Sequence, residues 1–96
     1  MVTGRTDDWA PTYDQTTSGF NITNTGNVNI SGIAAPASSG AWIVKCGGTN
    51  RVRLLDASTN SVAANRFDLG GANYTIQPGE FATIFYSTTT STWTII

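Results

Sequence analysis

The sequence YTIQPGEFATIFYSTTTSTWTII, residues 74–96, contains three short β-strand patterns separated by two turns. Pro78-Gly79 is a strong turn signal, because proline presets one backbone dihedral and glycine accepts a positive φ. Ser87–Ser91 is polar and indicates the second turn. The residues between the turns are mainly aromatic or β-branched, and these residue types favour the pleated surface of a sheet.

Strand patterns continue toward the N-terminus as far as Phe20, where apolar residues alternate with polar ones. Further strands are predicted around Phe20–Ile22, Val28–Ile30, Ala41–Cys46, Arg51–Leu55 and Arg66–Leu69. Short strands at a spacing of about 8–12 residues are typical of a sandwich or barrel. The sequence therefore predicts an all-β fold, a small antiparallel sandwich or barrel-like domain over residues 20–96.

Residues 1–19 show neither helical nor strand periodicity, and we interpret them as an extended N-terminal arm. The arm carries Asp7 and Asp8 and also two large aromatic residues, Trp9 and Tyr13. An arm that touched nothing would not need such side chains, so they indicate contact with a partner. The alternative is a terminus that folds back on its own domain.

Composition excludes several classes of function. The 96 residues include no histidine and one cysteine, which removes the commonest general base and any thiolate metal site. No nucleotide-binding glycine motif is present, so we expect no enzyme and no cofactor. The net charge of −1 and five basic residues argue against nucleic acid as a partner. No apolar run is long enough for a membrane span, and we expect no membrane partner.

Two neighbouring strands near the C-terminus are apolar on both faces. Phe81 and Phe85 alternate with other apolar residues, and Trp93 and Ile95 oppose Ile96. A small sandwich has one core, so apolar residues on both faces indicate that something covers the second face. We therefore expect a subunit interface at Phe81, Phe85, Trp93 and Ile95 in a homotrimer. The alternative is a scatter of exposed hydrophobic residues, which is normal on protein surfaces.

An ordered series of short segments resembles β-domains in tailed-phage fibres and other virion surface proteins. The series is Trp42-Ile43-Val44, Thr49–Leu54, Ala63–Phe67, Tyr74–Glu80, Phe85-Tyr86 and Trp93. It covers about residues 28–96. The chain is short and lacks the shaft of a fibre, so it is more similar to the capsid cement or decoration proteins of tailed phages.

The resemblance implies a virion structural protein on the capsid surface, without catalytic residues. Its partners would be two further copies of itself and the major capsid protein, whose shell it would stabilise. Asp7, Asp8, Trp9 and Tyr13 would then form a capsid-contact arm that orders on binding.

Two alternatives remain open at this point. One is a tail-fibre tip or receptor-binding module. The other is a free-standing carbohydrate-binding module, favoured by tryptophan and tyrosine together with asparagine and aspartate in loops. Both would make a glycan the partner.

Overall fold

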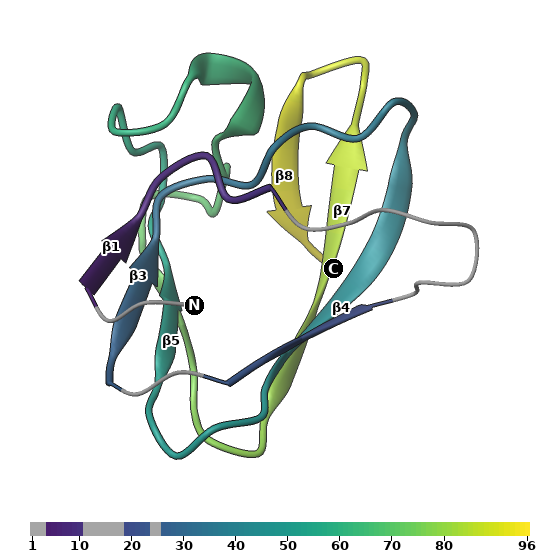
Figure 1. Ribbon diagram of the computed structural model, residues 1–96. Helices are drawn as coiled ribbons and strands as arrows, with labels where there is room; N and C mark the ends of the chain where they lie inside the picture. The colour runs from purple at the N-terminus through teal and green to yellow at the C-terminus, as the bar shows by residue number, and fades with distance from the viewer. Residues whose placement is uncertain (1–3, 11–18, 24–25) are drawn as a thin grey trace.

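The computed structural model describes residues 4–10, 19–23 and 26–96, and it confirms that the domain is all-β (Figure 1). Short β-strands alternate with loops, and one 3-10 helical turn, η1, interrupts them. The elements are β1 Gly4–Thr6, β2 Gly19–Ile22, β3 Val28–Ile30, β4 Gly40–Cys46, β5 Val52–Leu54, η1 Ala63–Asn65, β6 Tyr74–Ile76, β7 Phe81–Ser87 and β8 Thr92–Ile95.

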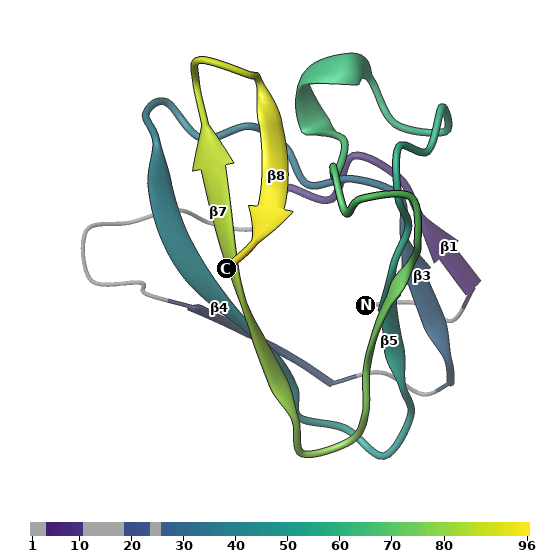
Figure 2. The same cartoon turned by 180° about the vertical axis from the view of Figure 1, so that it is seen from behind.

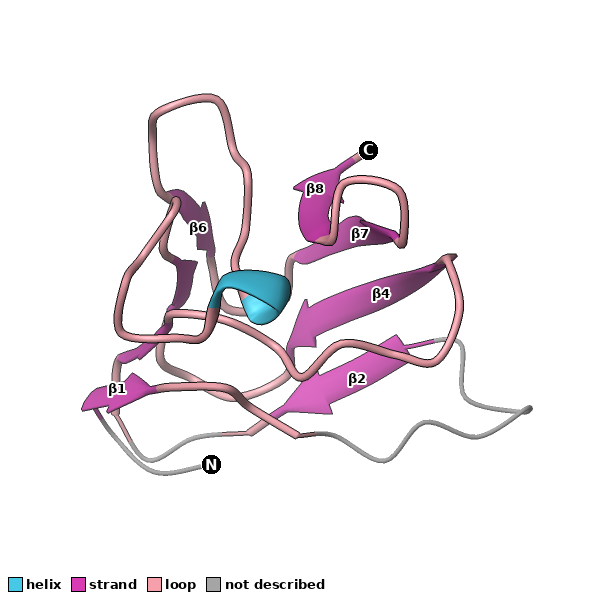
Figure 3. Cartoon of the chain, turned by 90° about the horizontal axis from the view of Figure 1, so that it is seen from above, coloured by secondary structure: helices cyan, strands magenta, loops and turns pink. Residues whose placement is uncertain are grey.

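The strands form two four-stranded sheets that enclose one core. One sheet has the order β1-β3-β5-β6 and the other has the order β2-β4-β7-β8. In Figure 3, β8, β7, β4 and β2 follow one another along one layer, and β1 and β6 belong to the other. Alternating residues on each strand point into the space between the layers, as expected for strands with one buried face.

Parallel pairing is the main departure from the predicted antiparallel arrangement. The ladders β1–β3, β3–β5 and β2–β4 are all parallel. The prediction is therefore wrong for this half of the chain, and both sheets are mixed. The reason lies in the connections: from β1 to β5 each strand crosses to the opposite sheet, so the chain returns to a given sheet in its original direction.

The first half of the chain is thus a coil with a constant period. Parallel partners are 24 residues apart in every ladder: Gly4 with Val28, Val28 with Val52, and Gly19 with Ile43. The isolated bridge between Trp9 and Ile33 has the same spacing. Each of β3, β4 and β5 therefore pairs, within its sheet, with the strand one turn of the coil earlier.

The second half of the chain closes the sandwich with antiparallel pairs. β5 pairs with β6, β4 with β7, and β7 with β8. The predicted turn at Pro78-Gly79 is present, with the Glu80 N–H donating to Gln77 O at 2.9 Å and Gly79 at a φ of 84°. The three strands predicted for residues 74–96 are therefore present as β6, β7 and β8, in the predicted order.

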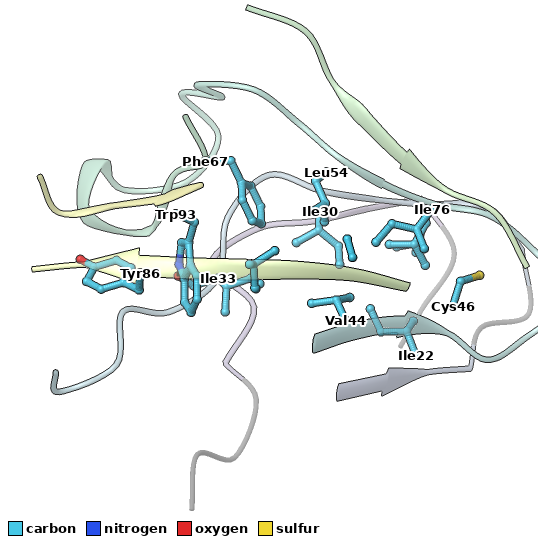
Figure 4. Close-up of a cluster of buried hydrophobic side chains, with 14 residues drawn as sticks. Ile22, Ile30, Ile33, Val44, Cys46, Leu54, Phe67, Ile76, Tyr86 and Trp93 are labelled. Atoms are coloured by element: carbon cyan, nitrogen blue, oxygen red, sulfur yellow. The ribbon is translucent and has the colours of Figure 1, made fainter. Parts of the chain in front are cut away.

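The core combines side chains from both sheets and from the loops at one end (Figure 4). Burial of each large apolar side chain contributes about 1.5–3 kcal/mol. The largest fully buried residues are Trp93, Phe67, Ile30, Ile33, Leu54, Ile76 and Ile84. Cys46 is also buried, and its Sγ donates to Asn50 O at 2.9 Å, so it behaves as a small core residue.

Residues 4–10 belong to the sandwich, although the sequence places them in an arm. β1 pairs with β3, and the Trp9 N–H donates to Gly32 O at 2.9 Å. The Trp9 ring packs partly buried against the core and meets Phe20 edge-on, with ring centroids 5.5 Å apart. This segment therefore follows the alternative, a terminus folded back on its own domain. The remaining residues of the expected arm, Tyr13 among them, lie outside the described residues.

Candidate functional site

The outward face of the β2-β4-β7-β8 sheet carries the most distinctive surface of the molecule. On β7, Ala82, Ile84 and Tyr86 point into the core, and Phe81 and Phe85 point outward. This division between the two faces agrees with the alternation in the sequence. The exposed fraction of Phe81 is 61%, and Phe85 is half-buried.

Two further apolar residues lie on the same face beside this pair. Ile43 of β4 stands opposite Thr83 of β7, and the Ile96 N–H donates to the Thr83 carbonyl. Ile43 is 41% exposed and Ile96 is 69% exposed. We name Ala41, Ile43, Phe81, Phe85 and Ile96 together the outer apolar face.

Charge is sparse on this sheet face. Within strands β2, β4, β7 and β8, Lys45 is the charged side chain, and it lies opposite Phe81. Its ammonium group sits on a flexible stem that reaches past apolar neighbours to water. An apolar patch with one adaptable cation at its margin suits contact with another protein surface.

Two of the four predicted interface residues lie elsewhere. Trp93 is fully buried, and its Nε1–H donates to Ile33 O at 3.0 Å, so its assignment to a subunit interface is wrong. Ile95 stands opposite Ile84 in the ladder and therefore faces inward, where it packs against the core. The pattern of β8 shows that alternate residues take opposite faces, but it does not say which face is inside.

The outward face of the β1-β3-β5-β6 sheet differs sharply from the outer apolar face. Arg5, Asn29, Arg53 and Thr75 form one row across its four strands. Arg53 Nε donates to Thr75 Oγ1 at 3.2 Å, and Asn29 Oδ1 accepts from Arg51 Nη1 at 2.9 Å. The two sides of the sandwich are therefore chemically distinct, one polar and basic and the other apolar.

Asp8, assigned from the sequence to a capsid-contact arm, ties the N-terminal segment to the loop after β5. Its Oδ1 accepts hydrogen bonds from Asn65 Nδ2 and from the Val62 N–H, both at 2.9 Å. Its own N–H donates to Ser61 Oγ at 2.9 Å. The bonds to its carboxylate, first the one from Asn65 and then the one from the Val62 N–H, hold the pKa of the Asp8 carboxyl below its usual value, because they favour the charged form.

Asp7 is held by a second set of bonds. Its Oδ1 accepts from Ser31 Oγ at 2.6 Å and from Arg5 Nε at 2.8 Å. The Ser31 bond first and the Arg5 bond second lower the pKa of the Asp7 carboxyl. Since Ser31 gives its hydrogen to Asp7, the buried contact of 2.6 Å between Ser31 and Ser61 has Ser61 as donor.

Residues 4–10, 19–23 and 26–96 contain no cluster of three or more histidine, cysteine, aspartate or glutamate side chains that could hold a metal ion. The described part of the chain also contains no helix with the length and apolar character to cross a membrane.

The outer apolar face was found only partly from the sequence. Phe81 and Phe85 were identified there, whereas Ile43 and Ile96 were not included. The missing information was that β4, β7 and the C-terminal residue Ile96 are neighbours in the folded chain. Comparisons of the chain with protein families, with curated proteins and with solved structures found no match.

Proposed function

We propose that this chain is a non-enzymatic structural protein that assembles through its outer apolar face, as a trimeric capsid decoration protein of a tailed phage. The observation that carries the assembly is the exposure of Phe81, Ile43 and Ile96 on one sheet face. The core is already closed beneath them, so these side chains are not needed to complete the fold. Contact with a second protein surface removes these apolar side chains from water, which is favourable.

A second copy of the same chain is the occupant that fits this face best. The face carries little charge, so contact between copies brings few like charges together. A small domain also gains stability when copies bury surface against each other. A threefold site on a shell selects a trimer, and the resemblance to cement proteins supports that choice.

The capsid assignment adds a second contact, with the major capsid protein. In a trimer joined through the outer apolar face, the opposite sheet face with Arg51 and Arg53 stays available for the shell. Binding to the assembled shell and not to dispersed subunits stabilises the particle by mass action.

Oligomeric state tests the assembly. Native mass spectrometry and light scattering of the purified chain should show a trimer. Phe81→Asp should convert it to monomers while the monomer stays folded, because Phe81 is exposed and a carboxylate in an apolar contact has no partner. Thr59→Asp, an equal charge change on an exposed loop residue, is the matched control and should remain trimeric. A wild-type chain that is monomeric at micromolar concentration contradicts the proposal.

Particle analysis tests the capsid role separately. The chain should co-purify with virions in a fixed ratio to the major shell protein. Virions stripped of it should break at a lower temperature than intact ones. If stripped particles are equally robust but no longer adsorb to host cells, a receptor-binding role replaces the cement role.

A further inference from the structure

A groove runs along the edge of the β2-β4-β7-β8 sheet beside β8. Its larger part has a volume of about 500 Å³ and lies between the loop that contains η1 and the turn that joins β7 to β8. Figures 1 and 2 show this loop and this turn side by side at the same end of the sandwich. The floor is the segment Arg66–Asp68, which pairs with β8 through the bridge between Phe67 and Trp93.

Arg66 and Asp68 both line this groove, yet they do not pair with each other. Arg66 Nε donates to Ser61 O at 2.9 Å, which orients the guanidinium group and leaves its terminal nitrogens without a partner in the described part of the chain. The Asp68 carboxylate accepts no hydrogen bond from any described residue, although its backbone N–H is fixed to Trp93 O at 2.7 Å. A donor and an acceptor of opposite charge therefore face one open space.

Asp68 also lines a second hollow of about 260 Å³, which we take as the continuation of the groove. Tyr74 lies there with 40% of its surface exposed, next to Asn73 and Thr94. Asn73 Oδ1 accepts from the Asp56 N–H at 2.9 Å, and Asp56 Oδ1 accepts from the Leu69 N–H at 2.7 Å. These bonds hold the wall in place and use the oxygen of the Asn73 side chain but not its amide hydrogens.

Backbone strain is concentrated at the same place. Ala57 and Ser91 line opposite walls of the larger part, and they have φ values of 45° and 55°. Such a backbone is costly for residues other than glycine and clusters at ligand sites, where it sets the shape of the wall. Asp8, with a φ of 46°, is the third such residue in the described ranges.

We propose that this groove binds a neutral saccharide of two or three sugar units. Its single positive and single negative charge balance, so a neutral ligand with both donors and acceptors suits it. Hydroxyl groups of Thr90, Ser91 and Thr92 add further polar contacts, and the methyl groups of Ala63 and Ala64 match the apolar face of a pyranose ring. The exposed ring of Tyr74 provides a surface on which a second sugar stacks.

The site goes beyond the structural role, and every lining residue comes from one chain. Its smaller hollow adjoins the outer apolar face, because Thr94 stands opposite Phe85 in the ladder between β7 and β8. The test is a ¹H–¹⁵N NMR titration of the whole protein with neutral mono-, di- and trisaccharides of hexose and N-acetylhexosamine at millimolar concentration. At least one should shift the backbone amides of Arg66, Asp68, Tyr74 and Ser91. If no saccharide in this set shifts them, or if the shifts lie on another surface, the proposal is wrong. Tighter binding of trigalacturonate, an anionic control, also overturns it.

Variants then test the residues that the proposal depends on. Asp68→Asn should weaken binding about tenfold, since hydrogen bonds to a charged group are the strongest that the groove offers. Tyr74→Ala should weaken it about fivefold through loss of stacking, whereas Tyr74→Phe, which keeps the ring, should change it little. Glu80→Gln, an exposed carboxylate outside the groove, is the matched control and should bind like wild type. Equal affinity of Asp68→Asn and wild type contradicts the proposal.

Discussion

Replacing Trp93 with phenylalanine tests the assignment of this residue to the core. Trp93 is fully buried, and its indole N–H is the donor to the buried Ile33 carbonyl. Two aromatic neighbours, Tyr86 and Trp42, meet its ring edge-on with centroids 5.0 and 5.6 Å away. Phenylalanine keeps much of the apolar contact but removes the donor and part of the ring.

The expected loss of stability has two parts. Leaving the Ile33 carbonyl buried without a donor costs about 1–3 kcal/mol. The missing ring atoms leave a void of about 40 Å³, which at about 24 cal/mol per Å³ costs about 1 kcal/mol. Trp93→Phe should therefore lower the free energy of unfolding by about 2–4 kcal/mol, a large part of the total for a domain of this size.

Urea unfolding followed by far-ultraviolet circular dichroism measures this loss, with native mass spectrometry on the same samples. Trp42→Phe is the matched control and should cost less, because Trp42 is only partly buried. The oligomeric state of Trp93→Phe should equal that of wild type. A loss below about 0.5 kcal/mol together with a changed oligomeric state would refute the core assignment and return Trp93 to an interface.

Three further changes probe the N-terminal segment and its surroundings. The lowered pKa values of Asp7 and Asp8 stabilise the fold above about pH 3.9, the usual aspartate pKa, and this stabilisation is lost as the pH falls through the lower folded-state values. As the pH falls, the urea unfolding midpoint of the Asp7→Asn, Asp8→Asn double variant should therefore decrease less than that of wild type. An unchanged pH dependence would show that other carboxyl groups cause the loss of stability in acid. Gly32→Ala should lower the free energy of unfolding by about 1–3 kcal/mol, because the added methyl would lie 2.5 Å from Asn65 O and 2.6 Å from Ser61 Oγ. Near-wild-type stability in thermal or urea unfolding would show that the backbone around Gly32 relaxes easily. Deleting residues 1–10 should lower the unfolding midpoint, because it removes β1 from the edge of β3 and Trp9 from the core; an unchanged midpoint would mean that the segment contributes nothing to the fold.

Most strand positions were predicted from the sequence because they depend on local alternation. The exceptions are β1, which lies in a segment without strand periodicity, and Arg66–Leu69, which forms isolated bridges instead of the predicted strand. The pattern of Phe81–Tyr86 divides the residues between two opposite faces without any knowledge of neighbours, and the structure has the same division. The predicted antiparallel pairing holds only in the second half of the chain, because pairing depends on how connections cross between layers. The spacing of 24 residues that joins β1, β3 and β5 was the available signal, but few residue identities repeat at that spacing.

The residues of the candidate site were likewise predicted correctly only where the local sequence pattern was sufficient. Phe81 and Phe85 were found from one strand alone, whereas Trp93 was misplaced because a lone strand does not reveal its inner face. Asp8 was taken for an arm residue because nothing near it in sequence indicates Asn65, 57 positions later, as its partner. Contacts of this range follow from topology and not from local pattern.

The coil of the first half also determines the order in which the fold forms. Each of its ladders closes a loop of 24 residues, and β4 has its antiparallel partner only in β7, close to the C-terminal end. Local hairpins form quickly, and contacts between distant residues form slowly because they must first overcome the entropy of loop closure. The β7–β8 hairpin is therefore expected to form early, and the coil then winds against it. During synthesis, one edge of β4 stays without its antiparallel partner until β7 emerges, which leaves that edge open to pairing with other nascent chains.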